Sequence, residues 1–187
     1  MRIPGSAGWG VAQSRLLGDR LRGEGAAVEV RHSPRRRAVE TAAVLGEVCG
    51  TPTIADPLLD DRTPVPAPGE EALYPDRMRA WFGSVPEDER DEGGAQLSAA
   101  VELCLADDRP LVLVTHAFVV GWFVQQILAG PVFAWTLIAA ANAGLTTIDR
   151  RPGRPPQLAG VNDVGHLHPA RPAIRPYAEA NEQPRPR

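Results

Sequence analysis

Short, continuous apolar runs alternate with longer stretches of helical spacing along most of the chain. Apolar residues recur every three to four positions in an amphipathic helix, whereas a strand covered on both faces is continuously apolar. The runs predicted as strands are 26–30, 51–59, 110–115, 143–150 and 157–163. The stretches predicted as helices are 11–21, 33–50, 76–85, 95–107, 117–130 and 131–139. This alternation predicts a three-layer α/β/α sandwich, in which helices cover both faces of a mostly parallel central sheet.

Capping residues, proline and glycine predict where several of these elements begin and end. Ser33 and Pro34 suit the N-cap and the first position of the 33–50 helix, and Gly50 suits its end. The last two strands are separated by the turn "RPGRPP", so we expect a hairpin there. Residues 60–75 hold too many prolines for regular structure and predict a long loop, a kind of segment that commonly carries function.

Length and composition predict one soluble domain over residues 1–167, followed by an irregular, proline-rich tail over residues 168–187. The 187 residues suffice for a sizeable core, whereas the tail has few large apolar side chains. Hydrophobic residues make up 43% of the chain and charged residues 23%, which is usual for a globular protein. His116 interrupts the apolar stretch 111–128, so a buried strand followed by a helix fits it better than a membrane span.

Charge and cysteine content narrow the classes of function. The net charge of −3 gives no overall reason to expect nucleic acid or an anionic membrane as a partner. Two cysteines are too few for a disulfide scaffold, and the first residues lack the apolar core of a signal peptide, so a cytoplasmic location is expected. No Cys/His spacing indicates a metal site and no glycine-rich phosphate loop is present, so neither a metal nor a cofactor is expected.

Candidate chemistry lies at two strand-to-helix junctions, of which the first is "VRHSPRRRAVETA". Here a predicted strand runs into a helix whose opening turn carries Arg35, Arg36 and Arg37. A helix N-terminus presents unpaired N–H groups and a positive dipole end, and arginine adds a planar fork that matches phosphate oxygens. The alternative is a solvated basic turn, or one that adheres to nucleic acid, because three adjacent arginines cannot all face one pocket.

The second junction, "LVTHAF", places His116 where an apolar strand ends and a helix begins. In open α/β sheets, ligands bind outside the carboxyl ends of the strands. A histidine there can donate to an anion, act as an acid or base, or be a nucleophile. A structural histidine with satisfied hydrogen bonds is the alternative. An arginine and a histidine at adjacent strand ends would form a phosphate pocket.

From about Gly10 to Leu167 the chain resembles the histidine phosphatase superfamily, which is phosphoglycerate-mutase-like. "HSPRRRAVETA" is similar to the family segment Ser-Pro-x-x-Arg-Ala-x-x-Thr-Ala, and "LVLVTHAFVVGWFV" resembles the strand that carries the family's second histidine. Gly10 and Gln13 match its Leu-Thr-x-x-Gly-x-x-Gln turn, and "NDVGHL" resembles the ending of a bacterial subgroup. The resemblance implies that Arg37 and His116 bind the phosphoryl group.

The chain departs from the family pattern at the nucleophile. The family opens with a strand ending in Arg-His-Gly, whose histidine is phosphorylated, and no such motif precedes Gly10. We therefore expect that strand and its nucleophile to be missing from this chain, through a misplaced start or genuine loss, and the upstream reading frame to encode them. His32 is the alternative nucleophile, but it lies only five residues before Arg37, with no room for the intervening helix.

Cleavage of a phosphomonoester also needs an acid near the leaving oxygen, because an alkoxide leaves poorly without a proton. The resemblance places a carboxylate after the third strand, and Asp61 matches that position. Asp60, Glu70 and Glu71 are the alternatives in the same segment, and any of the four could also simply solvate the loop.

The function implied by the resemblance is hydrolysis of a small phosphomonoester through a phosphohistidine. Arg37 and His116 would hold the phosphoryl oxygens as charge develops, and Asp61 would protonate the leaving group. A catalytically silent relative that binds a phosphate ligand or a protein is the alternative. The expected partner is a small phosphorylated substrate, with neither nucleic acid nor a membrane, and the oligomeric state stays open, a homodimer included.

Overall fold

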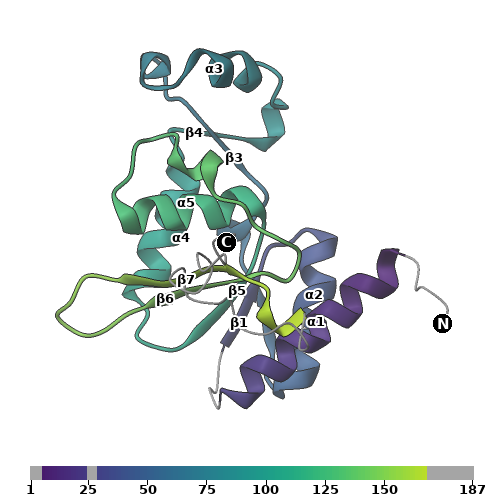
Figure 1. The fold of residues 1–187 in the computed structure, drawn as a ribbon. Helices are drawn as coiled ribbons and strands as arrows, with labels where there is room; N and C mark the ends of the chain where they lie inside the picture. The colour runs from purple at the N-terminus through teal and green to yellow at the C-terminus, as the bar shows by residue number, and fades with distance from the viewer. Residues whose placement is uncertain (1–5, 25–28, 168–187) are drawn as a thin grey trace, which may run out of the picture.

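A computed structural model describes residues 6–24 and 29–167 of the chain (Figure 1). The helices are α1 (Ser6–Gly23), α2 (Arg36–Cys49), α3 (Asp76–Phe82), α4 (Ala95–Ala106) and α5 (Ala117–Leu128). The strands are β1 (Glu29–His32), β2 (Thr53–Ala55), β3 (Thr63–Val65), β4 (Arg90–Glu92), β5 (Leu111–Val114), β6 (Leu145–Asp149) and β7 (Gln157–Asp163). Short 3₁₀ helices are η1 (Pro57–Leu59), η2 (Glu71–Leu73), η3 (Glu87–Glu89), η4 (Ala134–Leu137) and η5 (Gly165–Leu167). The predicted tail over 168–187 lies outside the described residues.

The central sheet is parallel and has the strand order β2-β1-β5. Val30 of β1 lies beside Thr53 on one side and Val112 on the other, and His32 lies beside Val114. Because the strands are parallel, their carboxyl ends meet at one edge of the sheet. The mostly parallel central sheet expected from the sequence is therefore confirmed, and β6 and β7 form the expected antiparallel hairpin.

Helices cover the two faces of this sheet, with α1 and α2 on one side and α4 and α5 on the other (Figure 1). The residues of β5 show the division, since successive strand residues point to opposite faces. Leu111 and Leu113 pack against the large core cluster that includes residues of α4 and α5. Val112 and Val114 pack against the smaller clusters built by α1, α2 and Val30. The observed layers are helix, sheet and helix.

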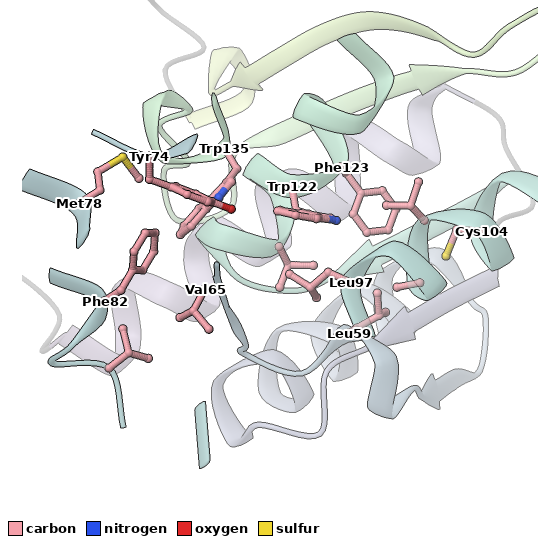
Figure 2. Packing of buried hydrophobic residues seen from close by; sticks show 14 residues of the cluster. Leu59, Val65, Tyr74, Met78, Phe82, Leu97, Cys104, Trp122, Phe123 and Trp135 are labelled. Carbon is pink, nitrogen blue, oxygen red and sulfur yellow. The ribbon is translucent and has the colours of Figure 1, made fainter. Parts of the chain in front are cut away.

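The large core lies between the sheet and the helices α4 and α5, and also includes Met78 and Phe82 of α3 (Figure 2). Leu97 of α4, Val119 of α5 and Trp135 of η4 are fully buried in it. Gly121 of α5 faces the Trp135 backbone so closely that a Cβ at this position would overlap it. Packing on both sides therefore fixes α5, the helix that follows His116.

The expectation of an irregular loop over residues 60–75 is wrong. Residues 63–65 form β3, which pairs in parallel with β4, and η2 follows. All three residues of β3 are buried, and the strand packs near α5. Its partner lies some 25 residues away in sequence, so the proline content of the segment could not reveal the pairing, and Pro64 is compatible with an edge strand.

The expectation of a helix over residues 131–139 is also wrong, because only the short η4 forms there. Trp135 is fully buried while Leu137 is 63% exposed, so this segment inserts one large ring into the core instead of burying a continuous helical face. The 33–50 helix also begins later than expected. Its N-cap is Arg35 and not Ser33, whose hydroxyl accepts a hydrogen bond from the Arg35 N–H at 3.2 Å.

Gly94 precedes α4 with a φ of +65°, and a Cβ there would overlap the Trp122 indole of α5. Gly94→Ala is expected to destabilise the fold by the strain of a left-handed backbone, about 1 kcal/mol, plus an overpacking cost of roughly 1–3 kcal/mol. Gly153→Ala is the matched control, because Gly153 has a φ of +72° but open space around its Cα. Urea unfolding measures both variants, and equal losses would show that Trp122 does not limit this junction.

Candidate anion-binding site

The site lies where the neighbouring strands β1 and β5 end and the helices α2 and α5 begin. The Ser33 N–H donates to the Val114 carbonyl at 2.9 Å, which extends the β1–β5 pairing to the very end of the strands. The N-cap residues are Arg35 and His116, and neither side chain accepts a hydrogen bond from the first turn of its helix. Two positive helix ends therefore meet at one edge of the sheet, an arrangement that favours an anion.

Arg37 and His116 are in direct contact across this junction. The Arg37 Nε–H donates to His116 Nδ1 at 3.1 Å, although the two residues are 79 positions apart. An arginine can only donate, so Nδ1 accepts and the proton of a neutral ring lies on Nε2, which faces Ser33 Oγ at 2.8 Å. Burial lowers the pKa of His116, with the Asp61 carboxylate opposing that effect. The neutral ring is therefore the form that suits the site without a ligand.

Asp61 completes the group, so the structure brings together the three residues singled out from the sequence. Its carboxylate forms an ion pair with Arg37 Nη2 and lies 3.7 Å from His116 Nδ1. Arg37 is 64% exposed and Asp61 33% exposed, whereas His116 is buried. An ion pair as exposed as this one contributes only about 0–1 kcal/mol, so a stronger anion can displace the Asp61 carboxylate from Arg37.

The loop that carries Asp61 is held by contacts on either side of η1. The Asp56 carboxylate accepts from the Leu58 N–H at 3.0 Å, which caps η1. Thr115, the residue before His116, donates its hydroxyl proton to the Leu59 carbonyl at 2.8 Å. Leu59 itself is fully buried. The position of Asp61 is therefore tied to the same strand end that positions His116.

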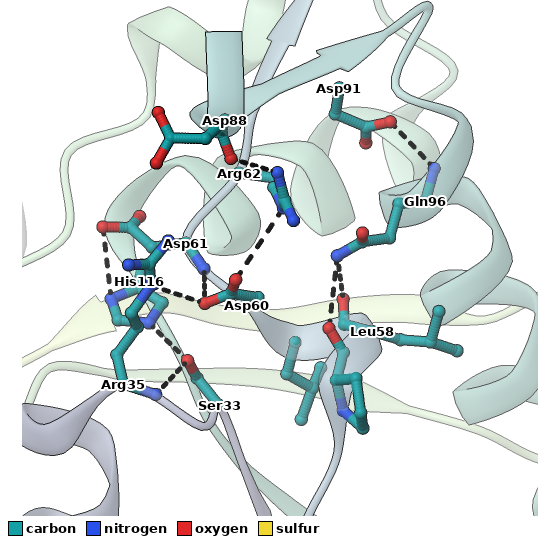
Figure 3. A network of polar contacts seen from close by, with 12 residues as sticks. Ser33, Arg35, Leu58, Asp60, Asp61, Arg62, Asp88, Asp91, Gln96 and His116 are labelled. Atoms are coloured by element: carbon teal, nitrogen blue, oxygen red, sulfur yellow. Dashed lines mark hydrogen bonds and ion pairs between the residues drawn. The ribbon is translucent and has the colours of Figure 1, made fainter. Parts of the chain in front are cut away.

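Asp60 and Arg35 form a second pair beside the first (Figure 3). Arg35 Nε donates to Asp60 Oδ1 at 2.7 Å, and the Asp61 N–H donates to the same oxygen at 2.8 Å. Burial acts to raise the pKa of Asp60, but these two hydrogen bonds outweigh it, and the pKa is lowered. Asp60 is thus an ionised group that holds the loop in place, and its ion pair with Arg35 keeps that arginine from binding another anion.

The remaining candidates lie away from Arg37 and His116. Arg36 is 91% exposed and pairs with Glu40 at 2.7 Å, so the three consecutive arginines point to three different partners. Glu70 and Glu71 are exposed, and within residues 29–167 neither forms a hydrogen bond or ion pair with Arg37 or His116.

The contacts of Ser33 and His32 could not be predicted from the sequence. Ser33 was assigned to a helix cap, whereas its hydroxyl contacts His116 Nε2 from a position 83 residues away. Such a contact depends on strand pairing and leaves no local signal. His32 is buried, and its Nδ1 lies 2.8 Å from the Ser33 carbonyl. Among the described contacts it bonds to neither Arg37 nor His116.

Two further searches cover only the described part of the chain. In residues 6–24 and 29–167, no group of three or more histidine, cysteine, aspartate and glutamate side chains is placed to hold a metal ion. No helix in these same ranges is long and apolar enough to cross a membrane.

Comparison with known proteins places this geometry in a family. The family model of the histidine phosphatase superfamily (branch 1) matches residues 8–164, which include both strand-to-helix junctions. The chain belongs to this superfamily. A probable phosphoglycerate mutase GpmB from Yersinia pestis (strain Pestoides F) is 27% identical over 178 residues, covering 84% of this chain and 81% of the relative.

Solved structures of the same fold have lower identity. A mycobacterial glucosyl-3-phosphoglycerate phosphatase superposes with a TM-score of 0.59 at 22% identity, covering 81% of this chain and 85% of the other. A putative alpha-ribazole-5'-P phosphatase from Escherichia coli gives 0.61 at 14% identity, covering 82% of each chain. These likenesses support the fold. The superfamily contains both phosphatases and mutases, so the family assignment leaves the reaction and the substrate open.

Proposed function

We propose that the Arg37–His116 pair binds the phosphoryl group of a small phosphomonoester, and that the chain provides the binding half of a phosphohistidine phosphatase site. The observation that carries the proposal is the contact between Arg37 and His116, where the N-termini of α2 and α5 meet. The Asp61 carboxylate is already paired with Arg37 at this point. A phosphoryl group presents more charge and more acceptor oxygens than that carboxylate. It would therefore bind Arg37 more strongly than Asp61 does.

In the proposed reaction, Arg37 and His116 hold the phosphoryl oxygens as negative charge develops on them. The phosphoryl group takes Arg37 away from Asp61 and leaves that carboxyl beside the leaving oxygen. As the nitrogen of the nucleophilic histidine forms a bond to phosphorus, the P–O bond breaks and the Asp61 carboxyl gives its proton to the leaving oxygen. Asp60 does not fit this role as well, because its hydrogen bonds to Arg35 and to the Asp61 N–H favour the ionised form.

We propose further that the nucleophilic histidine is not among the histidines of this chain. A nucleophile needs a free ring nitrogen, and both nitrogens of His116 are engaged, by Arg37 and by Ser33. His32 is buried, with Nδ1 against a backbone carbonyl. His166 lies in η5, which packs on α1; its ring nitrogens are buried, and neither contacts Arg37 or His116 among the described residues. His168 lies outside the described residues.

The unpaired edge of β5 is a position where a further strand carrying the nucleophilic histidine could pair. Among the described strands β5 pairs only with β1, so one edge of this apolar strand has no partner. All four residues of β5 are only half-buried, and Leu145 of β6 packs on the same cluster as Val112 and Val114. A strand added between β5 and β6 would end beside His116, where an Arg-His-Gly turn could present its histidine to the phosphoryl group.

Inorganic phosphate or vanadate is expected to stabilise the folded chain, by about 2.7 kcal/mol at a ligand concentration 100 times Kd. Arg37→Ala and His116→Ala should abolish this stabilisation, because each removes a group that would contact the ligand. Arg35→Ala is the matched control and should keep most of it, since Arg35 is held by Asp60. Thermal or urea unfolding with and without ligand measures the difference. An equal loss in Arg35→Ala would show that Arg37 is not the binding arginine.

Rapid quench of this chain with an aryl phosphate is expected to trap no phosphohistidine, since the nucleophile is absent. A form extended at its N-terminus by an apolar strand ending in Arg-His-Gly should give an acid-labile phosphoenzyme and turnover. Steady turnover by the present chain that is lost in His32→Ala would contradict the proposal and identify His32 as the nucleophile. Phosphate binding without turnover in the extended form would favour the silent, phosphate-binding relative.

A further inference from the structure

A second feature of the molecule contains neither Arg37 nor His116. It is a pocket of about 370 Å³ between α3, the first turn of α5 and η4. We call it the aromatic pocket, and it is lined by Arg77, Met78, Trp81, Phe118, Thr136 and Leu137. Its volume is within the range of sites that bind small organic molecules.

The walls of the aromatic pocket are rings held in place by one another. The Trp81 ring contacts Phe118 edge to face, at a centroid distance of 5.7 Å, and Phe118 contacts Trp135 in the same way at 5.1 Å. Trp135 is fully buried and anchors the group. Trp81 and Leu137 nevertheless stay 37% and 63% exposed. Fixed apolar surface of this kind is typical of a binding site.

Phe118 joins the aromatic pocket to the anion site. It lies two residues after His116, so the two Cα atoms are at most about 7.6 Å apart. Side chains in a helix lean toward its N-terminus, and the N-terminus of α5 is the end where Arg37 and His116 meet. One wall of the aromatic pocket therefore lies in the first turn of the helix whose N-terminus carries the anion site.

The polar groups that line the pocket determine which chemical groups of a phosphate ester it could bind. Thr136 is the only lining hydroxyl, and it already donates to the Phe133 carbonyl at 2.8 Å. Arg77 is exposed at the rim and has no ion pair among the described residues. No carboxylate and no amide lines the pocket. Apart from Arg77 at the rim and the oxygen of Thr136, the lining offers a sugar or polyol no hydrogen-bond partner, so most of its hydroxyl groups would lose their bonds to water at a cost.

We infer that the aromatic pocket binds the leaving group of the substrate, and that this group is a flat apolar one, such as an aromatic ring. The inference rests on the proposed function, because it needs the phosphoryl end on Arg37 and His116. It distinguishes this chain from an enzyme for short, hydroxylated phosphate esters, for which the pocket offers only Arg77 and Thr136 as hydrogen-bond partners.

The test compares phenyl phosphate with methyl phosphate, two monoesters that share the phosphoryl group and differ in the leaving group. Calorimetric titration of the chain should give a Kd for phenyl phosphate about tenfold lower, since burying a ring removes apolar surface from water. Trp81→Ala and Leu137→Ala should bring the two Kd values close together and leave the Kd of methyl phosphate unchanged. Leu137 is exposed, so its variant is expected to fold even if Trp81→Ala does not.

Two controls keep the outcomes apart. Leu128→Ala removes an equally exposed leucine, at 60%, from the far end of α5 and should keep the preference for phenyl phosphate. Arg77→Ala should keep it too, because neither leaving group carries a charge. Equal Kd values for both esters in the unmodified chain would refute the role of the aromatic pocket in binding the leaving group, and would leave the proposal for the anion site standing. Failure of both esters to bind, or binding that Arg37→Ala leaves unchanged, would overturn the proposed function itself.

Discussion

The candidate site depends on the parallel pairing of β1 with β5. Pairing in the observed register puts His32 beside Val114, and the bond from the Ser33 N–H to the Val114 carbonyl brings both strand ends to the same level. Only then does the first turn of α2 meet the first turn of α5, and Arg37 reach His116. A shift of one residue would turn every side chain of β5 to the opposite face, so the packing of both core layers fixes this register.

Charge balance explains why the site can be open to a ligand and still be ordered. Arg35 is neutralised by Asp60, and the Asp61 backbone N–H adds a hydrogen bond to that carboxylate, so this pair holds the loop. Arg37 is neutralised by Asp61 in an exposed pair that costs little to break. One acidic neighbour therefore maintains the structure, while the other sits where an anion would bind. In the proposed complex, the aromatic pocket would provide an apolar surface for the rest of the molecule.

Much of this arrangement could be predicted from the sequence, for physical reasons that also explain the errors. The strand 111–114 and the helix after it stand out because both are apolar, and His116 lies between them. Position alone left three consecutive arginines open, and the family resemblance selected Arg37 among them. The β3–β4 pairing joins distant segments of low apolar content, and nothing local marks it. The role of Ser33 could not be found either, because its contact with His116 forms only after β1 and β5 pair.

The most direct test of the central claim is the Kd of inorganic phosphate for the unmodified chain, Asp61→Asn and Asp60→Asn, measured by calorimetry at one pH and one ionic strength. If the Asp61 carboxylate occupies the place of an anionic ligand, its neutral replacement should bind phosphate several-fold more tightly than the unmodified chain. Asp60→Asn removes the same charge from the neighbouring residue but frees Arg35 and not Arg37, so it should gain less. Unchanged or weaker binding by Asp61→Asn would contradict the account.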